Sequence, residues 1–463
     1  GAEIKPGVLG TNPYEYMMSS FKEVNFNTLN TSLALNQDLS VITKGLSLKA
    51  LVNFKNWSET SYTRSIKSNI YKVKDGSYNP ETGEYDYQLL QTGDQFLSQS
   101  GISRNSDQTF YFDARLDWKR SFGDHNLTAM AMYMMREYRS DVLPNRNQGY
   151  SGRVTYDYAS KYLVEFNFGY NGSERLAAGQ RFEFFPAVSA GWVASSEKFW
   201  EPISKYINHF KIRGSYGLVG SDAFASGAPH FLYQNNIGIG SAHKFWTGLP
   251  TSEISKQGPG FYVLAVQDAG WEHVKKFDIG FDMMLFNQLN ITFDYFHDKR
   301  ERILMSRASW PSMLGSKPWS NIGEVENQGF ELSLNWTKQF GKDLTLDLRG
   351  NFTYNQNEYK YVDEPSYPYV WQTNTGKPLN TVKGYIAEGL FASEEEIANS
   401  PDQSQLGANI MPGDIKYRDV NGDGRIDADD MVPIAYSFNP LLMYGFGGEF
   451  QYKNFTIGPY RWF

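Results

Sequence analysis

The feature that most constrains the fold of this chain is a two-residue alternation of apolar and polar side chains. In FYFDARLDW (110–118), aromatic and aliphatic residues take the even positions, whereas Asp113, Arg115 and Asp117 take odd ones. Successive side chains of a β-strand point to opposite faces, so this segment predicts a strand with one apolar and one charged side. The same alternation recurs in LTAMAMYMM (127–135), YLVEFNFGY (162–170), FDIGFDMM (277–284), LNITFDYFH (289–297), FELSLNW (330–336) and LTLDLRGNFTY (344–354).

The links between these segments alternate between short and long. Short links fall near 41–45, 122–125, 159–161, 286–289, 340–343 and 453–454, and long polar links near 57–107, 139–148, 220–273, 302–326 and 357–438. Antiparallel strands that cross a membrane up and down have short turns on one side and long loops on the other. We therefore expect an all-β fold, a transmembrane antiparallel up-and-down β-barrel, with about 14 strands in this chain.

The composition excludes several other classes of protein. There is no apolar run of 18 residues that would form a transmembrane helix, and no cysteine for disulfides or thiolate metal sites. A net charge of −7 argues against a nucleic-acid partner. A soluble sandwich would also alternate, but the segments are long and tyrosines cluster at their ends, as they do at membrane interfaces. A propeller would show a repeat of about 40–50 residues, and we find none.

The segment DVNGDGRIDADD (419–430) has the spacing of a calcium-binding loop. Its candidate ligands are Asp419, Asn421, Asp423, the carbonyl of Arg425, Asp427 and Asp430. Calcium prefers six to eight oxygen ligands, and this spacing wraps oxygen donors around one point, with Gly424 permitting the sharp turn. The flanking segments lack helical periodicity, so we expect a structural calcium clip within a long loop rather than a switch.

Other features of the sequence indicate a function less specifically. Charged residues on the polar faces, such as Asp113, Arg115, Asp117 and Glu165, would either contact a substrate or solvate a polar interior. Aromatic residues in the long links would either stack on a substrate or pack the loops themselves: Trp246, Trp310, Trp319, Tyr367, Tyr369 and Trp371. Ser393 and Glu396 form a capping box that predicts a short loop helix. No catalytic motif is visible, so we do not expect an enzyme.

Several stretches resemble the SusC/RagA-like TonB-dependent transporters of the Bacteroidota outer membrane. They include RFEFFPAVSAGWVASSEKFW (181–200), KIRGSYGLVGSDA (211–223), AGWEHVKKFDIGFD (269–282), NIGEVENQGFELSLNW (321–336) and PGDIKYRDVNGDGRIDADD (412–430). Two more are NTLNTSLALNQDLSVITKGLSLKA (27–50) and TGKPLNTVKGYIAEGLF (375–391). The matches cover most of the chain and occur in the family's order.

The resemblance implies import across the outer membrane of oligomeric nutrients, either glycans or peptides. It implies a 22-stranded barrel with a plug, a SusD-like surface lipoprotein as a lid, the TonB energising complex, and a dimer of transporter–lid pairs. We find no plug or Ton box in the sequence, so we expect residues 1–463 to be part of such a barrel, with long extracellular loops near 57–107, 220–273 and 357–438. The alternatives are a calcium-dependent surface adhesin or glycan-binding β-protein, and a secreted glycan-degrading enzyme with a dockerin-like loop, although a dockerin carries two such loops.

Overall fold

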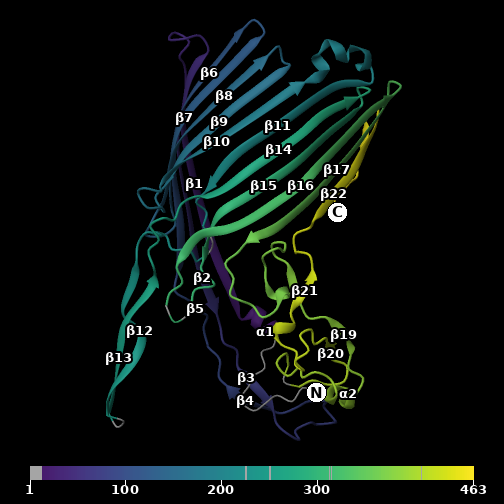
Figure 1. The fold of residues 1–463 in the computed structure, drawn as a ribbon. Coiled ribbons are helices and arrows are strands. Elements are labelled where there is room, and N and C mark those ends of the chain that lie inside the picture. The colour runs from purple at the N-terminus through teal and green to yellow at the C-terminus, as the bar shows by residue number, and fades with distance from the viewer. Residues whose placement is uncertain are drawn as a thin grey trace. The chain divides into compact units, whose positions relative to one another are not determined.

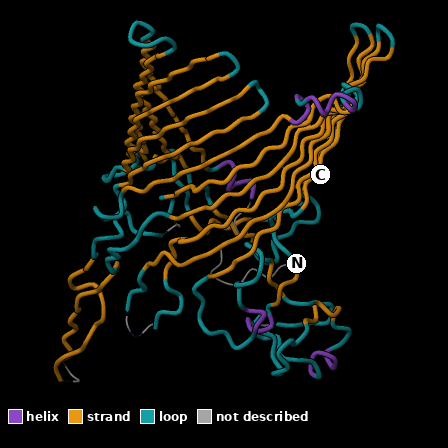
Figure 2. The backbone as a smooth tube through the Cα atoms, turned by 45° about the horizontal axis from the view of Figure 1, so that its top comes forward, coloured by secondary structure: helices purple, strands orange, loops and turns teal. Residues whose placement is uncertain are grey.

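The computed structural model describes residues 13–224, 227–249, 252–311, 313, 315–407 and 409–462, and most of these residues lie in β-strands (Figures 1 and 2). Backbone contacts divide the chain into two compact units. The first comprises residues 1–35, 50–113 and 135–146, and the second comprises 36–49, 114–134 and 147–463. None of the helices in the described residues is long and apolar enough to cross a membrane.

The first unit holds parts of four strands, residues 20–35, 50–65, 103–113 and 135–139, and two small additions. The four strands are β1 (Ser20–Asp38), β2 (Leu46–Ser65), β6 (Ser103–Phe122) and β7 (His125–Arg139), which pair in the order β1-β2-β6-β7. The additions are the antiparallel pair β3 (Ile70–Val73) and β4 (Tyr87–Gln91), and β5 (Ser98–Gln99), which pairs with β2. Helix α1 (Pro13–Met18) precedes β1.

Hydrogen bonds join the strands of the main sheet in chain order, along β1-β2-β6-β7-β8-β9-β10-β11-β14-β15-β16-β17-β22-β23. The bounds of its further strands are β8 (Asn145–Tyr158), β9 (Tyr162–Ser173), β10 (Phe182–Val193), β11 (Ile207–Ser221), β14 (Glu272–Leu285), β15 (Leu289–Ser306), β16 (Trp319–Phe340), β17 (Leu344–Tyr361), β22 (Leu442–Tyr452) and β23 (Phe455–Ile457). β24 (Tyr460–Trp462) pairs with β22. Neighbouring strands from β8 to β23 pair antiparallel, which confirms the up-and-down arrangement expected from the sequence.

Smaller elements occupy the links of the second unit. They are the hairpin β12 (Asn236–Leu249) and β13 (Ser252–Val263), the pair β18 (Val382–Gly384) and β21 (Val432–Ala435), and the pair β19 (Ala387–Leu390) and β20 (Ile415–Tyr417). Short helical turns are η1 (Ala194–Ser196), η2 (Lys198–Ile203), η4 (Val370–Gln372), α2 (Glu394–Ala398) and η5 (Ala428–Asp430). The Ser393 hydroxyl caps α2 by accepting from the Glu396 N–H at 3.2 Å, as the capping box predicts.

The alternation of the sequence becomes two chemically distinct faces of the sheet. One face carries a row of aromatic rings across five strands, in which Phe210, Phe281, Phe293, Phe330 and Phe352 follow one another with centroids 5.6–6.1 Å apart. Many apolar side chains of this face are exposed in the isolated chain, including Phe166 and Ile279. An exposed apolar surface of this extent requires apolar surroundings, so these strands gain stability from what lies outside the chain.

The short links are tight turns, because several of their residues adopt the left-handed conformation. Ala159 and Ser160 join β8 to β9 with φ of 51° and 57°, and Phe286 and Asn287 join β14 to β15 with φ of 53° and 54°. Positive φ at both central residues is the geometry of a type I′ hairpin turn, whose twist matches that of the flanking strands. Strand register on this side is therefore fixed locally.

The strands extend further into the long links than the alternation indicates. β15 runs to Ser306 and β16 begins at Trp319, so the link expected near 302–326 is shorter. A bulge at Arg302, which has φ of 56°, shifts the register between Arg300 and Ile303 and lets pairing continue beyond it. Charged residues conceal this extension in the sequence.

Candidate functional site

The polar face of strands β11, β14 and β15 is organised around Arg213. Its guanidinium lies 2.6 Å from an oxygen of Asp294, 3.4 Å from Asp282 and 3.5 Å from Asp278. Gly280 is the register partner of both Arg213 and Asp294, and a Cβ there would lie 2.1 Å from the Asp294 Oδ1 atom. The missing side chain at Gly280 therefore lets Arg213 reach a carboxylate two strands away.

A polar groove of about 800 Å³ lies on the same face of the sheet. Its lining combines hydroxyl groups, including Thr128, Thr155, Ser189 and Ser215, with charges of both signs. Glu165 borders the groove and accepts from Arg153 at 2.5 Å and from Asn167 at 2.7 Å. The hydroxyls and paired charges of this groove can form hydrogen bonds with water and hydrated solutes.

The buried core of the second unit lies where the long links meet the strands. It consists of Leu176, Phe185, Leu232, Ala269, Trp271 and Leu304, and Leu218, Phe224, Ala228, Val266 and Trp319 pack against it. The rings of Phe185 and Trp271 meet edge to face at 5.4 Å. These residues come from the links 174–181, 222–235, 264–271 and 307–318 or from the strand ends beside them, so the cluster ties several loop bases together.

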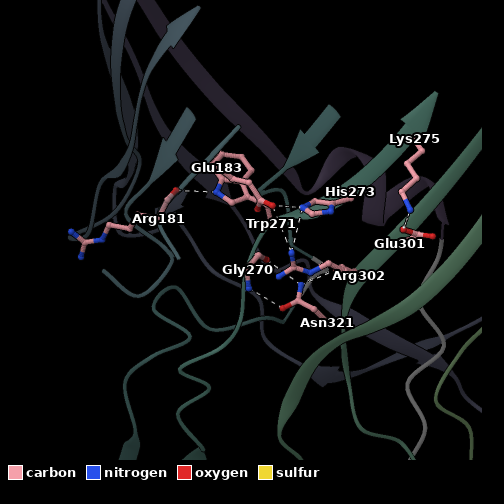
Figure 3. Close-up of polar contacts among 9 residues, drawn as sticks. All are labelled: Arg181, Glu183, Gly270, Trp271, His273, Lys275, Glu301, Arg302 and Asn321. Atoms are coloured by element: carbon pink, nitrogen blue, oxygen red, sulfur yellow. Dashed lines mark hydrogen bonds and ion pairs between the residues drawn. The ribbon is translucent and has the colours of Figure 1, made fainter. Parts of the chain in front are cut away.

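The four residues Gly270–His273, which we call the loop anchor, return the link 222–271 to strand β14 (Figure 3). The N–H of Gly270 donates to the Asn321 side chain at 3.0 Å, and the Trp271 indole donates to the Arg181 carbonyl at 2.9 Å. His273 Nε2 lies 2.7 Å from a Glu183 oxygen. These three residues of the anchor are thus held by β16 and by the start of β10 with the residue before it.

Glu272 is the buried acid of the loop anchor. Only 1% of its surface is exposed, its carboxylate contacts Arg300, and it accepts the N–H of Leu304 at 3.2 Å. A buried carboxylate is tolerated when it is paired and hydrogen-bonded, and here both conditions hold. The short sequence GWEH therefore fixes one end of a long loop.

The carboxylate loop 419–430 lies within the folded link between β17 and β22. Asp419 accepts the N–H groups of Gly422 at 2.6 Å and Gly424 at 2.8 Å, and both glycines have positive φ. Asp430 is completely buried and accepts from Val420 at 2.7 Å and from Asp427 at 3.0 Å. The first and last carboxylates therefore shape the loop through its backbone.

The remaining candidate ligands lie within the same turn. Asp423 accepts the Arg425 N–H at 2.9 Å, and the Asn421 oxygen accepts the Asp423 N–H at 3.0 Å. Ile426 is fully buried and its N–H donates to the Asp402 carbonyl at 2.8 Å, which joins the loop to its surroundings. The structure thus brings the predicted residues into one wrapped turn.

The donor chemistry of this turn suits a hard cation, because carboxylate, amide and carbonyl oxygens are what calcium binds. Within the described residues, however, no three acidic or histidine side chains converge closely enough to hold an ion. A metal ion would therefore draw the carboxylates of Asp419, Asp423, Asp427 and Asp430 together.

The other residues singled out from the sequence are spread over the chain. Arg115 pairs with Asp117 at 3.0 Å, and Lys49 lies 3.5 Å from the same carboxylate, which fits a solvated polar wall. Trp319 packs against the buried cluster, and the side chain of Trp246 lies outside the described residues. Tyr369 and Trp371 form a stacked pair.

Two groups of functional interest were missed in the sequence. The loop anchor appeared only as part of a family-like stretch, and Arg213 was one charge among many. Their partners Arg181, Asp294 and Asn321 are far away in the sequence. The glycine at position 280, in the middle of a strand, was the available signal, since such a glycine often marks a close approach.

The family model for TonB dependent receptor-like β-barrels matches residues 4–430. The chain belongs to this family, and the fold is part of an antiparallel β-barrel of the outer membrane. The apolar face described above is thus the face toward lipid, and the Arg213 face is the inner wall.

Individual relatives agree with this assignment. TonB-dependent receptor P3 of Formosa agariphila is 29% identical over 321 residues, 66% of this chain and 30% of that protein. TonB-dependent receptor SusC of Bacteroides thetaiotaomicron is 24% identical over 430 residues, 88% of this chain and 38% of that protein. The chain therefore spans roughly a third of the length of these curated relatives.

The fold is also similar to solved structures. The structure titled as the RagAB peptide transporter aligns with a TM-score of 0.68 at 16% identity, over 96% of this chain and 48% of that chain. The RagAB peptide importer in its "open-open" state aligns with a TM-score of 0.67 over 97% of this chain and 48% of that chain. These likenesses concern the fold alone.

Proposed function

We propose that the protein takes part in TonB-dependent import of oligomeric nutrients, glycans or peptides, across the outer membrane. The observation that carries this proposal is the polar inner wall, with its hydroxyl-lined groove, behind an apolar outer face. Such a wall accommodates hydrated solutes in transit. The family comprises receptors and transporters rather than enzymes.

In this proposal a SusD-like surface lipoprotein covers the long loops, the TonB complex supplies energy, and transporter–lid pairs associate as dimers. The name of the SusC relative and the titles of the RagAB structures support this direction. The anchored loop bases support it as well, because a lid needs fixed loops against which to close.

Uptake by intact cells tests the proposal. A strain that lacks the full-length protein would be compared with the complemented strain for uptake of fluorescently labelled oligosaccharides and, separately, labelled peptides. We expect the deletion to abolish uptake of one class, and removal of the energising complex to abolish the same uptake. If the deletion strain took up both classes as well as the complemented strain does, the proposal would be refuted.

We also propose that the carboxylate loop 419–430 holds a structural calcium ion. Its ligands would be Asp419, Asn421, Asp423, the Arg425 carbonyl, Asp427 and Asp430. Five aspartates against one arginine make this turn strongly acidic, and a divalent cation would relieve their mutual repulsion. When bound, the ion would close the turn and reduce the freedom of the surrounding link.

Calorimetry of the full-length protein in detergent tests the calcium proposal. We expect saturable calcium binding that Asp423→Asn weakens, and a lower melting temperature after chelation. The exposed acid Glu394 offers a matched control, Glu394→Ala, which should leave binding unchanged. The absence of both binding heat and any chelator effect would contradict the proposal.

A further inference from the structure

A stacked aromatic pair lies beside the carboxylate loop in the folded link between β17 and β22. The rings of Tyr369 and Trp371 are 4.6 Å apart and nearly parallel, with an interplanar angle of 7°. Val370 between them is 82% exposed, so the turn that carries the pair is on the surface of the link. Both residues belong to the short helical turn around η4.

Two lysines hold the backbone of this turn from one side. Lys377 Nζ donates to the carbonyls of Trp371 at 2.5 Å and Thr373 at 2.6 Å, and Lys383 Nζ donates to the carbonyl of Gln372 at 2.5 Å. Ammonium groups satisfy carbonyls at the end of a helical turn. Because these bonds involve only the backbone, the side chains of Trp371 and Gln372 are available for contacts on another side.

Those two side chains both contact Asp429, nearly sixty residues further along the chain. The Trp371 indole N–H donates to the Asp429 carbonyl at 2.8 Å, and the Gln372 amide donates to its carboxylate at 2.7 Å. The Gln372 side chain also accepts the N–H of Tyr369 at 3.3 Å. Asp429 is thus connected to both members of the aromatic pair. It contacts Trp371 directly, and it contacts Tyr369 through Gln372.

Asp429 is itself part of the carboxylate loop but is not one of its candidate ligands. Its N–H donates to the Asp427 carboxylate at 2.8 Å, and the N–H of Asp427 donates to Asp430 at 3.0 Å. An ion that draws Asp427 and Asp430 together acts on the same carboxylates that accept these hydrogen bonds. Asp429 would move with them, and so would the groups that it holds.

We infer that Asp429 transmits the state of the carboxylate loop to the Tyr369–Trp371 pair, so that calcium binding sets the position of these rings. This inference rests on the proposed calcium site and adds a consequence for it. The clip then does more than stiffen a loop, since it also positions two stacked aromatic rings that flank the exposed Val370. Asp429 is a positioning residue in this arrangement.

A single fluorescent label tests the inference. Residues 1–463 contain no cysteine, and any cysteine elsewhere in the full-length protein would be replaced by serine. Val370→Cys labelled with bimane, which nearby tryptophan and tyrosine quench, reports on the turn in the full-length protein. We expect calcium to change bimane emission with the same midpoint as calorimetric binding. Asp429→Ala removes the carboxylate that accepts from Gln372 and keeps the carbonyl that accepts from Trp371. It should reduce the emission change, while calorimetric binding persists. Glu394→Ala is the matched control and should leave both unchanged.

The outcomes separate this inference from the calcium site itself. Calcium binding without a change of emission, or an undiminished change in both Asp429→Ala and Trp371→Phe, would overturn the coupling and leave the clip intact. If the unsubstituted protein binds no calcium, both ideas fall together. Should Asp429→Ala fold poorly, Trp371→Phe keeps the ring stack but removes the indole donor, and it should give the same reduced response. A label at Val41→Cys, in a short turn, should not respond to calcium.

Discussion

Replacing Glu272 should loosen the link 222–271 without unfolding the sheet. Glu272→Ala removes the carboxylate that contacts Arg300 and accepts the Leu304 N–H. The Leu304 N–H then loses the acceptor that Glu272 provides. Because Leu304 is only 1% exposed, water cannot readily replace that acceptor. The strand pairing of β14 is made by backbone groups and remains, so the damage is local to the loop anchor.

The size of the effect follows from the burial of the two partners. Breaking a fully buried ion pair costs about 3–5 kcal/mol. The Arg300 side chain is 43% exposed, so water can solvate it after the change. We therefore expect a smaller loss, ~1–3 kcal/mol, most of it from the unsatisfied N–H. Glu272→Gln keeps an acceptor oxygen and should cost less than the alanine variant.

Native-state hydrogen exchange measures this loss directly, because it reports local opening. At ~1.4 kcal/mol per tenfold change, amides in the described parts of the link 222–271 should lose protection by about 5- to 150-fold. Glu326→Ala, which removes an exposed pair with Lys360 at 3.2 Å, is the control and should leave these amides unchanged. Equal protection in Glu272→Ala and the unsubstituted protein would refute the reasoning.

Three further substitutions test other parts of the structure. Phe166→Lys on the lipid face should destabilise the barrel by ~2–4 kcal/mol and reduce the heat-modifiable band on gels, whereas Asn167→Lys on the inner face should not; equal behaviour of the two would contradict the assignment of faces. Gly280→Ala should cost ~1–3 kcal/mol by overpacking against Asp294, and Gly350→Ala, whose Cβ would meet only the Gly445 carbonyl at 3.8 Å, should be nearly neutral in the same melting assay. Burial raises the pKa of Asp363, but hydrogen bonds from Ser309 and the charge of Arg307 outweigh it, so the net pKa lies below 3.8. Because the folded pKa is depressed, this carboxylate stabilises the loop fully above pH 3.8 and loses that effect as the pH falls through the folded value. Asp363→Asn should remove this acid dependence of exchange at Ser309, and an unchanged acid profile would count against it.

Much of the fold was predictable because strand alternation is a local signal. In the strand registers, Phe166 lies opposite Val188 and Phe281 lies opposite Ile212, so apolar residues line up across neighbouring strands as the alternation predicts. The short links near 159–161 and 286–289 are tight turns. The strand ends were less predictable, since β15 continues through a bulge at Arg302 that has no local signature in a charged stretch.

The candidate sites were predictable only where their residues are contiguous. The carboxylate loop was found because its spacing lies within 419–430. The loop anchor and the Arg213 cluster were not found, because Trp271 reaches Arg181 and Arg213 reaches Asp294 only after strands pair. The link between Trp371 and Asp429 depends on the folding of a long loop and has no sequence signal.

The independent anchoring of loop bases has a consequence for engineering. Since the tight turns set strand register on one side and GWEH secures a loop return on the other, the hairpin formed by β12 and β13 could be exchanged for a foreign hairpin. Such a graft would leave the wall beneath it unaltered. Natural selection has the same freedom, so relatives with similar strand walls could diversify by exchanging the loops that connect the strands.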